Sequence, residues 1–371
     1  MVIQLEGVIR NVRYTPHLSS PLHEYDFNNF DINAARGQGI VTVGANPLGF
    51  SKWISPKRTR SYPYARIYDT YGLGKRVTII PVIKDEGVNG DNDRINIVTL
   101  SLMNLLNVFV ILAWYEDAKP HAVRDGKIAG QLLPPDYVRE RVSEINSYQQ
   151  TALHWNLMHF GRDFEQVYRQ AVDSYQRISQ KLGVPVHSKA DHLNVLKQFL
   201  VDGQFDVNIF RDISLARSKN AASRETLTHH LQEFLQEGDK AALSLTNYLG
   251  GEYHLTVDEV FAAGDRIVLQ ESKNTTRHSL PSLNDIKDGL LKLILYNNID
   301  ELSVDGIPMA FEARLKLTGK IIGSLTLPAN ELEIAAFAHL NAFTKRRQLM
   351  LDQLNLETRL NSFRIDLMGN Q

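Results

Sequence analysis

The sequence contains no cysteine, so disulfide bonds, thiolate metal sites and cysteine nucleophiles are excluded. It also lacks a long apolar run. The longest, VFVILAW (Val108–Trp114), is far shorter than the roughly 20 residues that a membrane-spanning helix needs. The opening MVIQLEGVIRNVRYTP has neither the basic nor the apolar region of a secretory signal peptide. We therefore expect a cytoplasmic protein without a membrane partner, and any bound metal must have oxygen or imidazole ligands.

The chain has no strong excess of either charge, since its net charge is −1 over 371 residues. A basic excess is usual in nucleic-acid-binding proteins, so the distribution of charge matters more than the total. The segment Lys52–Arg76, which we call the basic segment, carries seven cations, one acid and four interleaved tyrosines. We interpret it as a loop that contacts DNA phosphates, although a charge run is also typical of solvated surface. The candidate DNA-binding residues are Lys57, Arg58, Arg60 and Arg66.

The first 222 residues have the patterns of a mixed α/β protein followed by helices. Buried strands are predicted at Val77–Ile83 and Val108–Tyr115, on either side of a helix at Arg94–Leu106. Apolar residues at helical spacing predict a long helical stretch over Tyr137–Leu182, which Gly183 and a following proline end. We therefore expect an α/β region over residues 1–130 and a helical region over residues 131–222.

A different order is predicted for residues 223–371. Alternating apolar residues predict three strands, a helix follows them, and a further strand and a long helix complete the chain. The predicted elements are a helix at Arg224–Gln236, strands at Ala241–Leu249, Tyr253–Phe261 and Arg266–Lys273, a helix at Leu283–Tyr296, a strand at Ala313–Leu317 and a helix from Asn330 towards Leu360. The order is therefore α-β-β-β-α-β within a third domain.

The hairpin between Tyr253 and Lys273 brings acidic residues together. Glu271 and Lys273 share a face because side chains alternate along a strand. A two-residue loop at Ala263-Gly264 would place Asp258 opposite Leu269, on that same face and diagonal to Glu271. Two carboxylates at that separation can reach one cation. A three-residue loop would select Glu259 instead of Asp258.

Three alternatives remain open, namely a structural role for these hairpin charges and two other acidic sites in the chain. An ordinary hairpin with charges on its wet face also explains Glu271 and Lys273, although an aspartate is unusual in a strand. The triplet Asp117–Lys119 is an alternative acid-x-Lys site, but no acid precedes it on a paired strand. The acidic stretch Lys84–Asp93 is more typical of a polar turn than of a metal site.

The segment TVDEVFAAGDRIVLQESKN (Thr256–Asn274), followed by LPSLNDIKDGLLKLILYNN, resembles the PD-(D/E)XK nuclease superfamily, particularly type II restriction endonucleases. The resemblance covers roughly the last 150 residues. It implies an αβββαβ nuclease core in the C-terminal half, with catalytic residues Asp258, Glu271 and Lys273. Val257 stands where the family often has proline.

On this interpretation Asp258, Glu271 and the main-chain carbonyl of Ser272 would hold Mg²⁺, which lowers the pKa of a bound water. Lys273 would orient or deprotonate that water or neutralise the phosphate, and the electrostatic role is the safer expectation. The resemblance thus implies a sequence-specific type II restriction endonuclease that leaves 5′-phosphate and 3′-hydroxyl ends. Its expected partners are double-stranded DNA, a second copy of the chain and a cognate DNA methyltransferase. The alternatives are another nuclease acting in repair, defence or RNA processing, and a DNA-binding protein without catalysis.

Overall fold

The computed structural model describes residues 3–57, 62–213, 216, 239–247 and 252–370 of a mixed α/β protein. The chain divides into two compact units. The terminal unit comprises Met1–Pro21 with Arg217–Gln371, and the central unit comprises Leu22–Ala216. This division differs from the three parts expected from the sequence. The predicted helical region shares one unit with the residues before it, and the first 21 residues belong with the C-terminal half.

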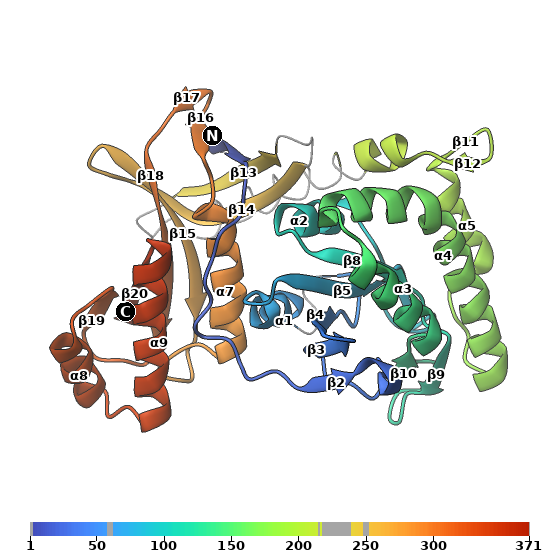
Figure 1. Cartoon of the computed structure of the whole chain (residues 1–371), viewed down its shortest axis with the longest axis horizontal. Helices are drawn as coiled ribbons and strands as arrows, with labels where there is room; N and C mark the ends of the chain where they lie inside the picture. The colour runs from blue at the N-terminus through green and yellow to red at the C-terminus, as the bar shows by residue number, and fades with distance from the viewer. Residues whose placement is uncertain (1–2, 58–61, 214–215, 217–238, 248–251, 371) are drawn as a thin grey trace. The chain divides into compact units, whose positions relative to one another are not determined.

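A nine-stranded sheet forms the terminal unit, in the order β17-β16-β1-β13-β14-β15-β18-β20-β19. The strands are β1 (Ile3–Ile9), β13 (Asp239–Asn247), β14 (Glu252–Ala263), β15 (Arg266–Asn274), β16 (Glu301–Val304), β17 (Ile307–Pro308), β18 (Phe311–Gly319), β19 (Ser324–Leu327) and β20 (Arg364–Gly369). The three consecutive strands predicted before the helix correspond to β13, β14 and β15, which pair antiparallel in that order. Strand β18 pairs parallel to β15. Strand β1 pairs parallel to β13, so the start of the chain lies inside the sheet of the C-terminal half (Figure 1).

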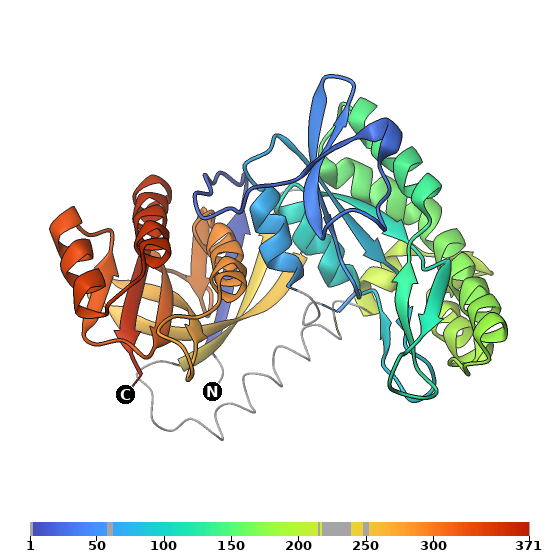
Figure 2. The same ribbon diagram turned by 90° about the horizontal axis from the view of Figure 1, so that it is seen from below.

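One face of this sheet is covered by helices. In β18 every second residue from Ala313 to Gly319 is buried, which is the pattern of a sheet with one covered face. Helix α7 (Leu283–Tyr296) packs on β15 and β18, and α9 (Lys345–Asn361) packs on β19 and β20. Figure 2 shows both helices on the same side of the sheet. The helix predicted at Leu283–Tyr296 is confirmed.

The prediction of one long C-terminal helix is wrong. Helix α8 (Glu331–Leu340) ends before α9 begins, and Ala342 between them has a positive φ of 49° that no helix continues through. Asn330 caps α8 in a reciprocal box with Glu333. The helix predicted at Arg224–Gln236, the first element of the αβββαβ order, lies outside the described residues.

The central unit is built on the sheet β2-β3-β4-β5-β8. Its strands are β2 (Glu24–Asp26), β3 (Gln38–Val43), β4 (Asn46–Lys52), β5 (Lys75–Pro81) and β8 (Phe109–Ala113). Strands β4, β5 and β8 are parallel neighbours, so their carboxyl ends meet at one edge. Two short hairpins accompany this sheet, β6 (Ile83–Asp85) with β7 (Asn92–Arg94) and β9 (Asp117–Pro120) with β10 (Ile128–Leu132).

Helices pack around the central sheet. Helix α1 (Pro63–Thr70) packs on β3 and β4, while α2 (Ile97–Leu105), α3 (Pro135–Ser147) and α4 (Ala152–Leu182) pack on β8. The expected helical stretch over Tyr137–Leu182 is therefore two helices, because Tyr148 has an extended backbone between them. Helix α5 (Lys189–Lys197) follows and packs on α4, and a short hairpin of β11 (Leu200–Val201) and β12 (Gln204–Phe205) comes after it. None of the helices in the described part of the chain combines the length and apolar character needed to cross a bilayer.

Candidate active site

The hairpin of β14 and β15 has a two-residue turn, but at a different position from the one predicted. Ala263 pairs with Arg266, so the turn consists of Gly264 and Asp265, and Gly264 has a positive φ of 67°. A glycine is favoured where the first loop residue has a positive φ, which explains the shift. The expected pairing of Asp258 with Leu269 is wrong, since Leu269 pairs with Val260. Although the turn has moved, Asp258 and Glu271 still lie on the same face of the hairpin. Glu259 pairs with Gln270, so the next position along the two strands places Asp258 opposite Glu271.

A bulge in β14 positions Asp258. Val257 pairs with Ala241 and Val260 pairs with Asp239, so two residues of β14 lie opposite the single residue Lys240. The ladder to β15 ends at Glu259, and the Ser272 main-chain N–H donates instead to Asp258 Oδ2 at 3.0 Å. Bulges commonly redirect a side chain in this way. The Ser272 carbonyl points to the same side of β15 as its N–H, towards Asp258.

Glu271 and Lys273 face α7, and two side chains of that helix meet them. Lys273 Nζ lies 3.0 Å from Glu271 Oε1 and 3.0 Å from Asp288 Oδ2. Lys292 Nζ donates to the other oxygen of Glu271 at 2.6 Å. The carboxyl group of Asp258 also contacts Glu271. We call these five residues the acid–lysine cluster, and its three acids and two lysines give a net charge of −1 when all are ionised.

Local sequence places α7 against this cluster. Ser282 caps the helix by accepting from the Asp285 N–H, and Asp288 and Lys292, four residues apart, lie on one helix face. Gly289 permits the close approach, because a Cβ there would lie 2.8 Å from Leu315 Cδ1 and 3.4 Å from Lys273 Cε. A Cβ at position 289 would displace the Leu315 side chain of β18.

The two central carboxyl groups titrate differently. Burial acts to raise the pKa of Asp258, but the Lys292 ammonium, the Ser272 N–H and the Lys273 ammonium outweigh it and hold that pKa below its usual value. Burial raises the pKa of Glu271, the Lys292 ammonium acts against this rise, and the Asp258 carboxylate adds to it. Asp258 therefore stays ionised, and Glu271 takes up a proton first as the pH falls.

Lys273 keeps its proton. Burial acts to lower its pKa, but the carboxylates of Glu271 and Asp288 outweigh burial and raise that pKa above its usual value. A general base must lose its proton near the working pH, so deprotonation of water by Lys273 is disfavoured. The electrostatic role expected as the safer one is consistent with this geometry.

The donor set fits a magnesium ion, which takes only one or two carboxylates and retains several waters. Asp258 and Glu271 supply two contacting carboxylates, and the Ser272 carbonyl faces the same side. No group of three or more His, Cys, Asp or Glu side chains among the described residues is arranged to hold a metal ion. A metal at Asp258 and Glu271 would therefore depend on water and main-chain oxygen for its remaining ligands.

Glu259 lies on the opposite face of the hairpin, as predicted. It accepts from Gln270 Nε2 at 2.7 Å and from Ser272 Oγ at 2.8 Å, and Lys316 Nζ lies 3.3 Å away. These three partners leave Glu259 outside the acid–lysine cluster. Asp258, and not Glu259, is therefore the acid of β14 that contacts Glu271.

Sequence reasoning missed Asp288 and Lys292. Both lie in the predicted helix, and Lys292 is 5% exposed within a run of buried residues from Gly289 to Tyr296. A lysine in such a run is a signal of a buried partner, since lysines are almost never fully buried unless paired. The sequence does not indicate which strand residue supplies that partner.

The basic segment is not the open loop that was expected. Arg66 lies in α1, and its Nη1 donates to the Lys52 carbonyl at 2.6 Å. Lys75 donates to three carbonyls at the end of α3, and Arg76 stacks on Tyr71. Lys57 is exposed and pairs with Asp93 at 3.0 Å. Arg58 and Arg60 lie outside the described residues, and the proposed DNA contact remains a prediction.

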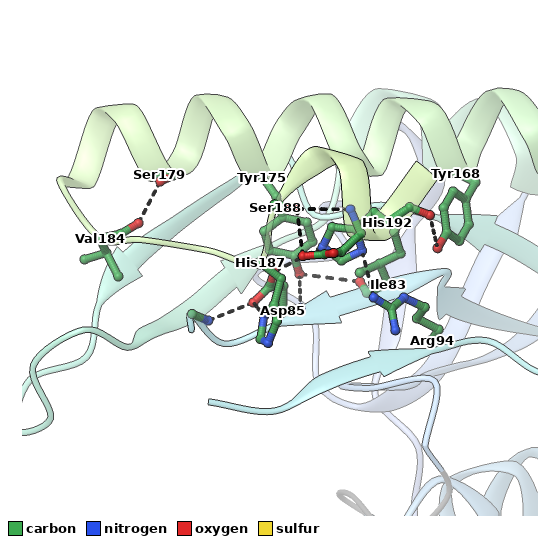
Figure 3. A network of polar contacts seen from close by, with 12 residues as sticks. Ile83, Asp85, Arg94, Tyr168, Tyr175, Ser179, Val184, His187, Ser188 and His192 are labelled. Atoms are coloured by element: carbon green, nitrogen blue, oxygen red, sulfur yellow. Dashed lines mark hydrogen bonds and ion pairs between the residues drawn. The ribbon is translucent and has the colours of Figure 1, made fainter. Parts of the chain in front are cut away.

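The other acidic candidates have internal partners. Asp117 pairs with Lys181 at 2.7 Å, and Lys84 pairs with Glu86 at 2.7 Å. Asp85 is fully buried at the centre of the network in Figure 3, where it binds the rings of His187 at 2.9 Å and His192 at 3.2 Å. Main-chain N–H groups of Gly87 and His187 also donate to its carboxylate. His187 lies in the loop before α5 and His192 in α5 itself, so their contacts with Asp85 tie this part of the chain to β6, which is a structural role.

No protein-family model, curated protein or solved structure matches the chain. The likeness to the PD-(D/E)XK superfamily therefore rests on the hairpin residues and their placement.

Proposed function

We propose that this chain is a Mg²⁺-dependent nuclease of the PD-(D/E)XK type that hydrolyses phosphodiester bonds in duplex DNA. Within that class we propose a sequence-specific type II restriction endonuclease that leaves 5′-phosphate and 3′-hydroxyl ends. The observation that carries the proposal is the meeting of Asp258, Glu271 and Lys273 on one face, beneath a helix that adds a second lysine to Glu271. If these residues were only the charged side chains of an ordinary solvent-exposed hairpin face, they would point to solvent instead of packing beneath a helix.

Each residue of the cluster has a distinct part in the proposed chemistry. Asp258, Glu271 and the Ser272 carbonyl would hold Mg²⁺, which supplies positive charge and lowers the pKa of a bound water. Lys273 remains protonated and stabilises the negative charge that develops on the phosphoryl oxygens. Asp288 fixes the position of the Lys273 ammonium, and the Lys292 ammonium opposes the rise in the pKa of Glu271 that burial causes.

The proposed reaction also sets expectations for partners. Cutting both strands of a duplex needs two sites, which a symmetric homodimer would provide. A restriction function implies a cognate DNA methyltransferase that protects the host sequence. Phosphate contact by Lys57, Arg58 and Arg60 is part of this proposal, and the bonded position of Arg66 makes it the weakest member of that set.

Digestion of a plasmid of known sequence tests the proposal. The full chain is incubated with supercoiled DNA in Mg²⁺, in Ca²⁺ and in EDTA, beside the variants Glu271→Gln and Glu259→Gln. We expect discrete fragments in Mg²⁺ only, their loss in Glu271→Gln, and their retention in Glu259→Gln, whose side chain lies on the opposite face. A smear would indicate a nuclease of another kind on the same core. Binding without cleavage in every cation would overturn the nuclease assignment.

A further inference from the structure

A cavity of about 470 Å³ lies in the central unit, at the carboxyl ends of its parallel strands. Lys52 ends β4 and Trp53 follows it, Tyr115 comes after β8, and the β9–β10 hairpin supplies further lining residues. In open α/β sheets ligands bind outside the carboxyl ends of the strands. The volume is within the range of about 300–1,000 Å³ that small-ligand sites occupy.

The lining of this cavity is strongly basic. It includes four cationic residues, Lys52, Lys84, Arg124 and Lys127, against one acid, Glu86. Lys84 and Glu86 pair at 2.7 Å and neutralise each other, which leaves three positive charges. A concave site with charge of one sign raises the local concentration of the opposite ion. The cavity therefore favours an anion.

Several donors at the cavity have no acceptor within the described part of the chain. The indole N–H of Trp53 has no hydrogen-bond partner there, although the residue is 2% exposed. Neither Arg124 nor Lys127 forms a side-chain hydrogen bond or ion pair with a described residue. The Nδ1 atom of His121 accepts two main-chain N–H groups, at 3.2 and 3.1 Å, so the neutral ring carries its proton on Nε2. Of these groups only Trp53 is buried, and a buried donor without an acceptor is costly, so an anionic ligand that accepted from its N–H would remove that cost.

Lys52 forms no ion pair with a described residue, although the Asp31 carboxylate acts to raise its pKa. Its ammonium donates to the carbonyls of Ile32 at 2.6 Å and Ala35 at 2.7 Å. Burial, reinforced by the neighbouring Arg66 guanidinium, lowers the pKa of Lys52 to about 8. A bound anion would act in the opposite direction and keep this lysine charged.

We propose that this cavity binds a phosphate-bearing ligand up to the size of a nucleotide. Phosphate suits a site with several converging cations and N–H donors, because its oxygens accept from more than one donor at once. The phosphate can come from two sources, a free nucleotide or the 5′-phosphorylated end of a DNA strand. The site is distinct from the acid–lysine cluster, which belongs to the terminal unit.

Titration calorimetry on the full chain tests this proposal. The chain carries Glu271→Gln and is kept in EDTA, so that cleavage at the acid–lysine cluster plays no part. The probes are inorganic phosphate, deoxyadenosine monophosphate, and one oligodeoxynucleotide with either a 5′-phosphate or a 5′-hydroxyl end. We expect binding of the mononucleotide. If the 5′-phosphorylated oligonucleotide binds more tightly than the 5′-hydroxyl form, the bound phosphate comes from a DNA strand end. If the two oligonucleotides bind equally while the mononucleotide binds, the ligand is a free nucleotide.

Variants locate the binding. Arg124→Ala combined with Lys127→Ala removes two unpaired cations and should weaken mononucleotide binding about tenfold, the effect of two modest charge contacts. Trp53→Phe keeps a ring but removes the N–H and should also weaken binding. The matched control is Lys119→Ala, an exposed lysine on the same hairpin that does not line the cavity. Absence of binding by every probe, or equal affinity in the double variant and the control, would overturn the proposal.

Discussion

Replacing Lys292 by methionine removes the ammonium that lies 2.6 Å from Glu271 Oε2 but keeps a side chain of similar length. Glu271 is 1% exposed, so its carboxylate cannot regain water when its partner is lost. Leaving one member of a buried ion pair alone costs roughly 3–5 kcal/mol in unfolding free energy. Lys273 still contacts the other oxygen of Glu271 at 3.0 Å, so we expect a loss near the lower end, about 3 kcal/mol.

The loss should depend on pH in a defined direction. Without Lys292 the pKa of Glu271 rises further above its unfolded value of about 4.3. A carboxyl group with a raised folded-state pKa favours folding when protonated, so stability falls as the pH rises through that pKa. Urea unfolding followed by circular dichroism should therefore find the largest deficit of Lys292→Met at pH 8 and a smaller one at pH 5. A loss of unfolding free energy below about 1 kcal/mol at both pH values would refute the claim that Lys292 compensates the buried charge of Glu271.

Magnesium adds a second readout to this variant. A cation held by Asp258 and Glu271 would replace the missing positive charge, so saturating Mg²⁺ should raise the Tm of Lys292→Met more than that of the wild type. The matched control is Lys287→Met, which removes another buried lysine of α7, one that donates to Ser20 at 2.6 Å. The control should lose stability without any additional gain from Mg²⁺. Equal Mg²⁺ effects in both variants would argue against a metal at Glu271.

Three further predictions follow from single residues. Asp258→Asn should lower single-turnover cleavage by roughly 10²–10³, whereas Glu259→Gln, on the opposite face, should stay within a few-fold of wild type; the reverse result would mean that the wrong acid is assigned. The acetylation rate of Lys52, followed by peptide mass spectrometry, should rise with pH and level off above about pH 8, because its amine loses its proton there; a rise that continues to about pH 10 would contradict the effect of burial. Gly289→Ala should cost roughly 1–3 kcal/mol in urea unfolding, since its Cβ would lie 2.8 Å from Leu315 Cδ1 and displace that buried side chain of β18; wild-type stability would show that α7 has room to shift.

The secondary structure around the hairpin was predictable because its signals are local. Alternating apolar residues mark β14 and β15, and Ser282 with the following apolar spacing marks α7. Whether Asp258 and Glu271 share a face depends only on whether the turn has an even or an odd number of residues. The predicted turn and the observed turn both have two residues, so the predicted face was correct although the turn lies one residue later in the chain. The bulge beside Asp258 left no comparable mark in the sequence.

Features that depend on distant pairing were not predictable. Strand β1 pairs with β13, more than 200 residues later in the chain, and no local pattern specifies that choice. Lys292 was overlooked because its partner Glu271 lies on another element, 21 residues earlier in the chain. The charge of the basic segment suggested an exposed loop that contacts DNA phosphates. In the structure Lys75 and Arg76 instead donate hydrogen bonds to main-chain carbonyls of the central unit. Composition alone does not distinguish these two uses of a cation.

Single-turnover cleavage of duplex DNA by Lys273→Ala tests the central claim most directly. The substrate is a duplex that the wild type cuts, Mg²⁺ is saturating, and DNA binding is measured in parallel in Ca²⁺. Both carboxylates and the Ser272 main chain remain, so binding should be retained while the cleavage rate falls by roughly 10² or more, the usual effect of losing a charge-stabilising group. Lys273→Arg should not restore the rate, because a guanidinium differs in shape from the ammonium held between Glu271 and Asp288. Cleavage by Lys273→Ala at the wild-type rate would contradict the account.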